Sequence, residues 1–187
     1  MNANTTPAPV RRGNPLRPYV WGAAAALLSI PAIAMQFTDE VNWDAFDFIV
    51  MGALLAFACG VYEVGARLSG NRAYRGGFAV AILAGFLMVW INLAVGIVGN
   101  EDNPVNLLFF GILGVGAIAA PLGRFRPMGM ARALYATAIA QAAVTAYIAL
   151  AGHGYVFVLS GFFIAAWLTA AHLFQVAHEG SAPQGPA

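Results

Sequence analysis

The sequence predicts an all-α membrane protein: a polytopic bundle of six transmembrane helices joined by short loops. Hydrophobic residues make up 60% of the 187 residues and charged residues only 9%, whereas a soluble domain has about 25% charged residues. All nine basic residues are arginines, and they fall in three clusters separated by long apolar runs. Most acidic residues lie in the alternate gaps, so the sign of the charge alternates along the chain.

Residues 1–18 contain four prolines and three arginines, which predicts an extended polar tail before the first helix. We expect residues 19–178 to form the six-helix domain and residues 179–187 to form a second, short tail. Each apolar run has the length that a membrane crossing needs, roughly 17–25 residues. The helices are predicted at about residues 19–36, 44–67, 75–99, 104–122, 128–151 and 155–178.

The first apolar run, Tyr19–Phe37, follows Arg17 and has the three regions of a secretory signal. The same run is long enough to span a bilayer. We expect it to stay in the protein as the first transmembrane helix. Cleavage after this run is the alternative, and it would leave the topology of the remaining chain unchanged.

Local signals place the start and the end of the second and third helices. Asp44 and Asp47 have the spacing of a helix N-cap and an acidic residue at the third helical position. The second helix ends at Arg67, before a basic turn at residues 68–74. The third helix is expected to end at the second acidic loop, residues 100–103.

The fourth helix is expected to follow Asn103, because asparagine is a favoured N-cap and Pro104 suits the first helical position. It ends at a second basic turn, residues 123–127. Glycine recurs along this helix and alanine along the fifth, and small residues let helices approach closely. His153 and Gly154 predict a tight turn before the sixth helix.

The charge pattern also predicts the direction of each crossing, because short arginine-rich loops stay on the cytoplasmic side. The arginine clusters lie before the first helix, around the second gap and around the fourth gap. The acidic loops occupy the first and third gaps. We therefore predict that both termini are cytoplasmic and that the acidic loops face outward.

Six acidic residues on the outer side are the strongest candidates for a ligand or ion site. They are Asp39, Glu40, Asp44, Asp47, Glu101 and Asp102. If their two loops, which also contain several asparagines, meet at one mouth of the bundle, the oxygens would suit a hard cation. The alternative is structural, because acids at a helix N-terminus cap the helix and complement its dipole.

Glu63 lies inside the second predicted helix, four residues before Arg67. Glutamate and arginine pair at this spacing on a helix face, which favours a structural ion pair near the cytoplasmic end. An acid at membrane depth is also a candidate for function. A proton or substrate relay through Glu63 is therefore the alternative interpretation.

Three further polar residues lie inside predicted helices, and such residues usually join helices by hydrogen bonds. They are Asn92, Gln141 and His172. Asn92, in the outer half of the third helix, is also a candidate for the ligand or ion site together with the six acids. A haem held by two histidines is not expected, because His153 and His178 lie at opposite rims of the membrane.

Several functions are not expected from this sequence. The one cysteine, Cys59, cannot form an intrachain disulfide, and no cysteine–histidine spacing typical of a metal site occurs. The hydrolase, metalloprotease and nucleotide-binding motifs are absent from the sequence. Because topology accounts for the arginines, we expect no nucleic-acid partner, and we expect neither a cofactor nor a metal. An enzymatic role is the least favoured interpretation.

Two segments carry a family resemblance: MQFTDEVNW at residues 35–43 and WINLAVGIVGNEDNP at residues 90–104. Over about residues 19–178, the chain resembles a family of small, uncharacterised multi-pass inner-membrane proteins of Gram-negative bacteria. The resemblance implies the same architecture and a location in the bacterial inner membrane. That family has no assigned activity, so the resemblance implies no functional residue.

The sequence favours a non-catalytic membrane protein with an outer vestibule rich in acids and asparagines and an accessory or assembly role. Its expected partners are the lipid bilayer and either a second copy of the chain or another membrane protein. The alternative is a small cation- or proton-linked transporter or channel that uses the outer acids with Glu63 and His172. A continuous polar path through the bundle would favour the transporter.

Overall fold

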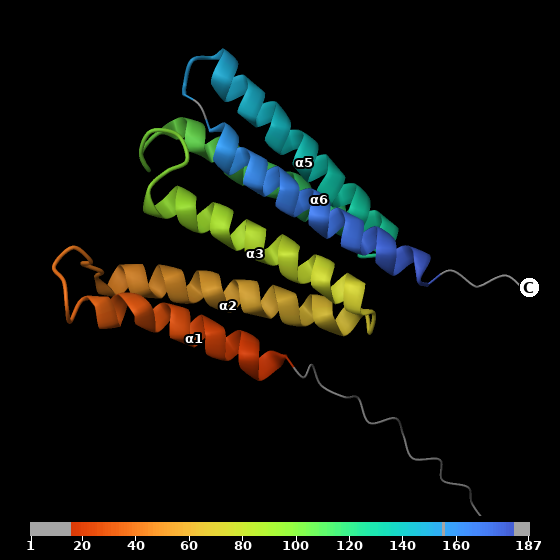
Figure 1. Cartoon of the computed structure of the whole chain (residues 1–187), viewed down its shortest axis with the longest axis horizontal. Helices are drawn as coiled ribbons and strands as arrows, with labels where there is room; N and C mark the ends of the chain where they lie inside the picture. The colour runs from red at the N-terminus through yellow and green to blue at the C-terminus, as the bar shows by residue number, and fades with distance from the viewer. Residues whose placement is uncertain (1–15, 155, 182–187) are drawn as a thin grey trace, which may run out of the picture.

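The computed structural model describes residues 16–154 and 156–181 of the chain. Within these residues, six α-helices follow one another and no strand forms (Figure 1). A short 3-10 turn, η1 (Pro104–Asn106), precedes the fourth helix. The helices are α1 (Arg17–Ala34), α2 (Ala45–Leu68), α3 (Arg72–Ala94), α4 (Leu107–Leu122), α5 (Pro127–Leu150) and α6 (Phe157–Glu179). The all-α prediction is confirmed for the described residues.

In the part of the chain that the structure describes, five helical segments are long and apolar enough to cross a membrane: α2, α3, α4 with η1, α5 and α6. α1 is not among them. Its 18 residues meet the length of a crossing, but Arg17, Pro18 and Tyr19 at its start make it less apolar than the other five segments. A multi-pass helical bundle is therefore confirmed with five candidate crossings, and a sixth crossing by α1 stays a prediction.

The predicted boundary at the end of the third helix was wrong. We expected a helix to residue 99, but α3 ends at Ala94, because Gly96 takes a left-handed backbone conformation with a φ of +70°. α1 begins at Arg17, slightly before the predicted start. Residues 1–15 and 182–187, which belong to the two predicted tails, lie outside the described residues.

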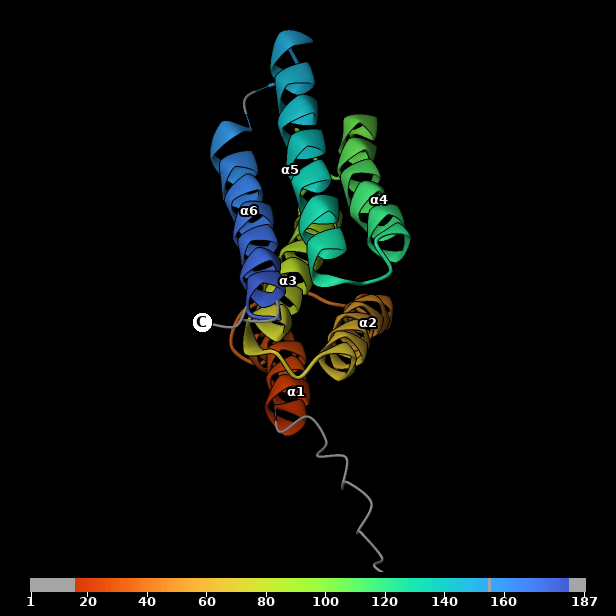
Figure 2. The same cartoon turned by 90° about the vertical axis from the view of Figure 1, so that its right-hand side faces the viewer.

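Consecutive helices run in opposite directions, and α3 lies between α2 and α6 in both views of the bundle (Figure 1, Figure 2). α3 also contacts α4, α5 packs against α4 and α6, and α1 packs chiefly against α2. The two acidic loops lie at one end of the bundle, and the α2–α3 and α4–α5 turns lie at the other (Figure 1). The described arginines are thus separated in space from the acidic loops.

The main hydrophobic core lies among α3, α5 and α6, where the Phe163 and Phe174 rings are fully buried. Small residues bring these helices together: a Cβ added at Gly77 of α3 would lie 3.0 Å from the ring of Phe174. The outward faces expose large apolar side chains such as Val158 and Ile118. Apolar outer faces over several long helices suit a lipid environment.

Candidate functional site

At the acidic end, a capping box builds the start of α2. Asp44 Oδ1 accepts hydrogen bonds from the N–H groups of Phe46 at 2.7 Å and Asp47 at 3.0 Å. Asp47 Oδ2 in turn accepts the Asp44 N–H at 2.9 Å. Trp43 packs against Phe48 with ring centroids 5.3 Å apart, which is the hydrophobic staple that accompanies such a start. The structural role predicted for these two acids is therefore present.

The other four outer acids are exposed on the two loops at this end. Asp39 and Glu40 belong to the α1–α2 loop, and Glu101 and Asp102 belong to the α3–α4 loop. Within the described residues, no three or more histidine, cysteine, aspartate or glutamate side chains are grouped so that they could hold a metal ion. The six acids therefore share one end of the bundle without forming such a group.

Asn106 organises the α3–α4 loop, a role that was not predicted from the sequence. Its Oδ1 accepts the N–H groups of Ile97 at 3.1 Å and Val98 at 2.8 Å. Its Nδ2 donates to the carbonyl oxygens of Val98 at 3.3 Å and Asn100 at 2.6 Å. The side chain is buried, and its hydrogen bonds hold the first half of the loop against the start of the next helix. In the sequence, an asparagine beside a helix start looks like an ordinary cap.

A pocket of about 440 Å³ lies between the start of α2 and the end of α3, at the acidic end. Two tryptophans line it together with Asp47: Trp43, which precedes α2 in the α1–α2 loop, and Trp90 of α3. Asp47 is the only one of the six outer acids that lines this pocket. The other lining residues are Asn42, Phe46, Val50, Met51, Leu54, Leu93 and Ala94. We refer to this space as the outer pocket.

At the arginine end, Glu63 lies between two arginines. Its Oε1 accepts a hydrogen bond from Arg67 Nη2 at 2.7 Å and lies 3.3 Å from the Nε of Arg17 on α1. The pairing with Arg67 agrees with the prediction, whereas the link to Arg17 was not predicted. The Glu63 side chain is 13% exposed, so the two guanidinium groups neutralise a largely enclosed carboxylate.

Of the other polar residues inside the helices, Asn92 bonds within its own helix and Gln141 joins two helices. Asn92 donates to a carbonyl oxygen one turn earlier in α3 at 3.0 Å. Gln141, which is fully buried in α5, donates to Ser160 Oγ on α6 at 3.3 Å. His172 is exposed on α6. Among the described residues, no hydrogen bond or ion pair joins His172 to Glu63, whose partners are Arg67 and Arg17.

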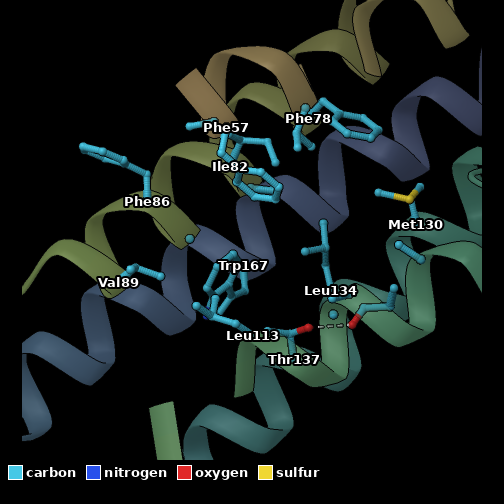
Figure 3. A pocket seen from close by; sticks show the side chains of 18 of the residues that line it. Phe57, Phe78, Ile82, Phe86, Val89, Leu113, Met130, Leu134, Thr137 and Trp167 are labelled. Atoms are coloured by element: carbon cyan, nitrogen blue, oxygen red, sulfur yellow. Dashed lines mark hydrogen bonds between the residues drawn. The ribbon is translucent and has the colours of Figure 1, made fainter. Parts of the chain in front are cut away.

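An apolar cavity of about 370 Å³ lies between α2 and α4, with α3 and α5 behind it and Trp167 reaching in from α6 (Figure 3). Trp167 and Thr137 are its only lining residues with a side-chain nitrogen or oxygen. The Thr137 hydroxyl already donates to a carbonyl oxygen of α5 at 2.9 Å. Phe57 and Phe125 line it and are 70% and 40% exposed, so the cavity opens on the side of the bundle. We refer to it as the lateral cavity.

Comparisons of the chain with protein-family models, with curated proteins and with solved structures gave no match. The resemblance to small inner-membrane proteins therefore stays a prediction.

Proposed function

We propose that this chain is a non-catalytic protein of the bacterial inner membrane with an accessory or assembly role, and that it holds a transmembrane helix of a partner protein in the lateral cavity. The cavity is the observation that carries the proposal. Its volume of about 370 Å³ is that of a small-molecule pocket, roughly 300–1,000 Å³, so a few side chains of the partner helix would enter it while the helix itself lies against its rims. Its apolar lining and its side opening suit an occupant that arrives through the bilayer.

The two rims of the lateral cavity differ in a way that suits a helix. The α4 rim carries small residues one turn apart, Gly116 and Ala120, with Ala117 between them. Gly116 already faces Thr137 of α5, where an added Cβ would lie 2.9 Å from the hydroxyl oxygen. The exposed Ala117 is therefore the small residue that lets another helix approach α4 closely. The α2 rim presents the exposed ring of Phe57, which would pack against the side of the incoming helix.

In this proposal the arginine end faces the cytoplasm, in agreement with the rule for short arginine-rich loops. α1 would be the sixth crossing, with both termini inside. The ion pair between Arg17 and Glu63 supports this placement, because it fixes the start of α1 beside the arginine end of α2. α1 also packs along α2, as expected of two antiparallel crossings.

Cation- or proton-linked transport is the second candidate, and the outer pocket with its Asp47 carboxylate favours it. The lateral cavity does not support it, because Thr137 is its only lining residue with a side-chain oxygen. Reconstitution into proteoliposomes tests this function directly. A proton or cation flux that is present in the parent and lost in Asp47→Asn would replace the accessory role by transport.

Photo-crosslinking in membranes of the native source tests the accessory role. A photoreactive residue in place of Phe57 should yield a discrete protein adduct, whereas one in place of Val158, which is 91% exposed on α6, should not. Adding Ala117→Trp, which fills the cavity, should remove the Phe57 adduct. Identical adducts at both positions, or adducts to lipid alone, would contradict the proposal.

A further inference from the structure

We propose that the outer pocket binds a quaternary ammonium group, held between the rings of Trp43 and Trp90 with the carboxylate of Asp47 as its counterion. This inference goes beyond the accessory role proposed above, and it concerns a different space. The lateral cavity lies between α2 and α4, whereas the outer pocket lies between α2 and α3 at the acidic end.

Contacts within the protein hold both tryptophans in place. The ring of Trp43 meets Phe48 edge-on, with an interplanar angle of 65°, and the ring of Trp90 lies 5.7 Å from that of Phe86. Both indoles also pack against one small hydrophobic core, formed by Met51, Leu55 and Phe86. The two rings are therefore positioned before a ligand arrives, which lowers the entropic cost of binding.

Asp47 gives the pocket a fixed negative charge. Its Oδ2 accepts the backbone N–H of Asp44 at 2.9 Å, which holds the carboxylate at the start of α2. Within the described part of the chain, the salt bridges involve only Glu63 and two arginines at the far end, so no salt bridge neutralises Asp47. The other outer acids lie at the same end as the pocket, and a surface of one sign attracts the opposite charge.

The chemistry of the lining residues favours an organic cation over a metal ion. A metal ion such as calcium takes roughly six to eight oxygen ligands, whereas Asp47 and Asn42 are the only lining residues with a side-chain oxygen. Aromatic faces beside a carboxylate suit quaternary ammonium groups, which cation–π attraction holds. Aliphatic residues, among them Val50 and Leu54, continue the lining of the pocket and would accommodate an apolar group attached to the nitrogen.

Equilibrium dialysis of the full-length protein in a neutral maltoside detergent, with radiolabelled choline as the probe, tests the proposal. We expect saturable binding that excess choline displaces. The neutral carbon isostere of choline, in which carbon replaces the ammonium nitrogen, should not displace it, because cation–π attraction requires the charge. Equal displacement by the isostere, or no saturable binding, would overturn the proposal.

Two variants that each remove one negative charge distinguish a specific contact of choline with Asp47 from a general effect of net charge. Asp47→Asn keeps an oxygen that can accept the Asp44 N–H, so the capping box is retained while the charge is lost. Choline affinity should fall on the order of five- to tenfold. Asp39→Asn makes the same change of net charge outside the pocket and should bind like the parent. Equal affinities in all three proteins would overturn the assignment of Asp47.

The aromatic walls are tested independently of Asp47. Trp43→Phe and Trp90→Phe keep an aromatic face, so each should bind choline more tightly than the corresponding leucine variant. Leucine variants that bind as well as the parent would contradict a cation–π site.

A trimethylammonium group reaches this side of the membrane either on a free solute or on a phosphatidylcholine headgroup. If the headgroup occupies the pocket, choline binding should disappear in phosphatidylcholine nanodiscs and persist in phosphatidylglycerol nanodiscs. Equal choline binding in both would identify the free solute as the source.

Discussion

The hydroxyl of Tyr74 on α3 donates a hydrogen bond of 2.7 Å to the backbone carbonyl oxygen of Phe125 in the α4–α5 turn. Phe125 and Arg124 both have a φ of +53°, a left-handed conformation that is unfavourable for residues with a side chain. Gly123 and Gly129 meet so closely in this turn that a Cβ on either would overlap the backbone of the other. Tyr74 therefore ties a strained, arginine-bearing turn to the central helix.

We predict that Tyr74→Phe lowers the free energy of unfolding by about 0.5–1.5 kcal/mol, because the Phe125 carbonyl oxygen loses a partly buried hydrogen bond. Tyr74 is 1% exposed, so water cannot readily replace its hydroxyl. Denaturant unfolding of the purified protein in detergent measures the change. Tyr147→Phe, at an exposed position of α5, is the control and should match the parent. Equal stability of both variants would show that the turn does not depend on Tyr74.

We predict that Gly96→Ala destabilises the protein by about 1–3 kcal/mol, since a left-handed backbone costs this much for a residue with a side chain. An added Cβ would also overlap the carbonyl oxygen of Asn100 and lie 2.7 Å from Asn106 Nδ2. Gly60→Ala is the matched control, because Gly60 lies in α2 with no atom within 4 Å of an added Cβ. It should leave stability unchanged or raise it by up to about 1 kcal/mol. Thermal unfolding curves that coincide for the two variants would show that the loop conformation at Gly96 does not contribute to stability.

The ion pairs of Glu63 predict a non-additive result. Glu63→Gln should be mild, because glutamine keeps a hydrogen-bond acceptor and the two arginines, which are 61% and 67% exposed, remain in water. Removing Arg17 and Arg67 together should lower the melting temperature by more than the sum of the two single changes, because the carboxylate then has no partner. Additive losses would exclude a shared ion pair.

A relay through Glu63 makes a different prediction about the same glutamine variant. In a proton relay, Glu63→Gln should abolish a pH-dependent flux while the protein still folds. In a structural ion pair, neither the parent nor the variant should show such a flux in proteoliposomes. Absence of flux in folded parent protein would leave only the structural pair, and loss of a parental flux would restore the relay.

Local signals in the sequence predicted much of this architecture. The apolar runs and the charge clusters are each continuous in the sequence. The helices and the separation of the arginines from the acids were therefore predictable. The spacing of Asp44 and Asp47 predicted the capping box for the same reason. The early end of α3 had a local signal in Gly96, because a glycine in the left-handed conformation just after the C-cap commonly ends a helix. The hydrogen bonds from Ile97 and Val98 to Asn106, which shape the loop that follows, depend on packing and were not predictable.

The lateral cavity and the outer pocket were not predictable from the sequence, because each depends on how the helices pack. Trp43 and Trp90 belong to different parts of the sequence, and no spacing rule relates them. The lateral cavity exists because α2 and α4 stand apart over α3 (Figure 2). The contact between Arg17 and Glu63 was likewise not predictable, because it joins α1 to α2. The pair of Glu63 and Arg67 was predictable from its spacing within one helix.

The orientation of the bundle is the central claim, because the proposed role, the outer pocket and the sixth crossing all depend on it. Single cysteines in a Cys59→Ala background, at the exposed positions Asp102 and Arg126, test it with a membrane-impermeant maleimide on spheroplasts. We predict that Asp102→Cys reacts in intact spheroplasts and that Arg126→Cys reacts only after lysis. Labelling of Arg126→Cys in intact spheroplasts, with Asp102→Cys protected until lysis, would contradict it.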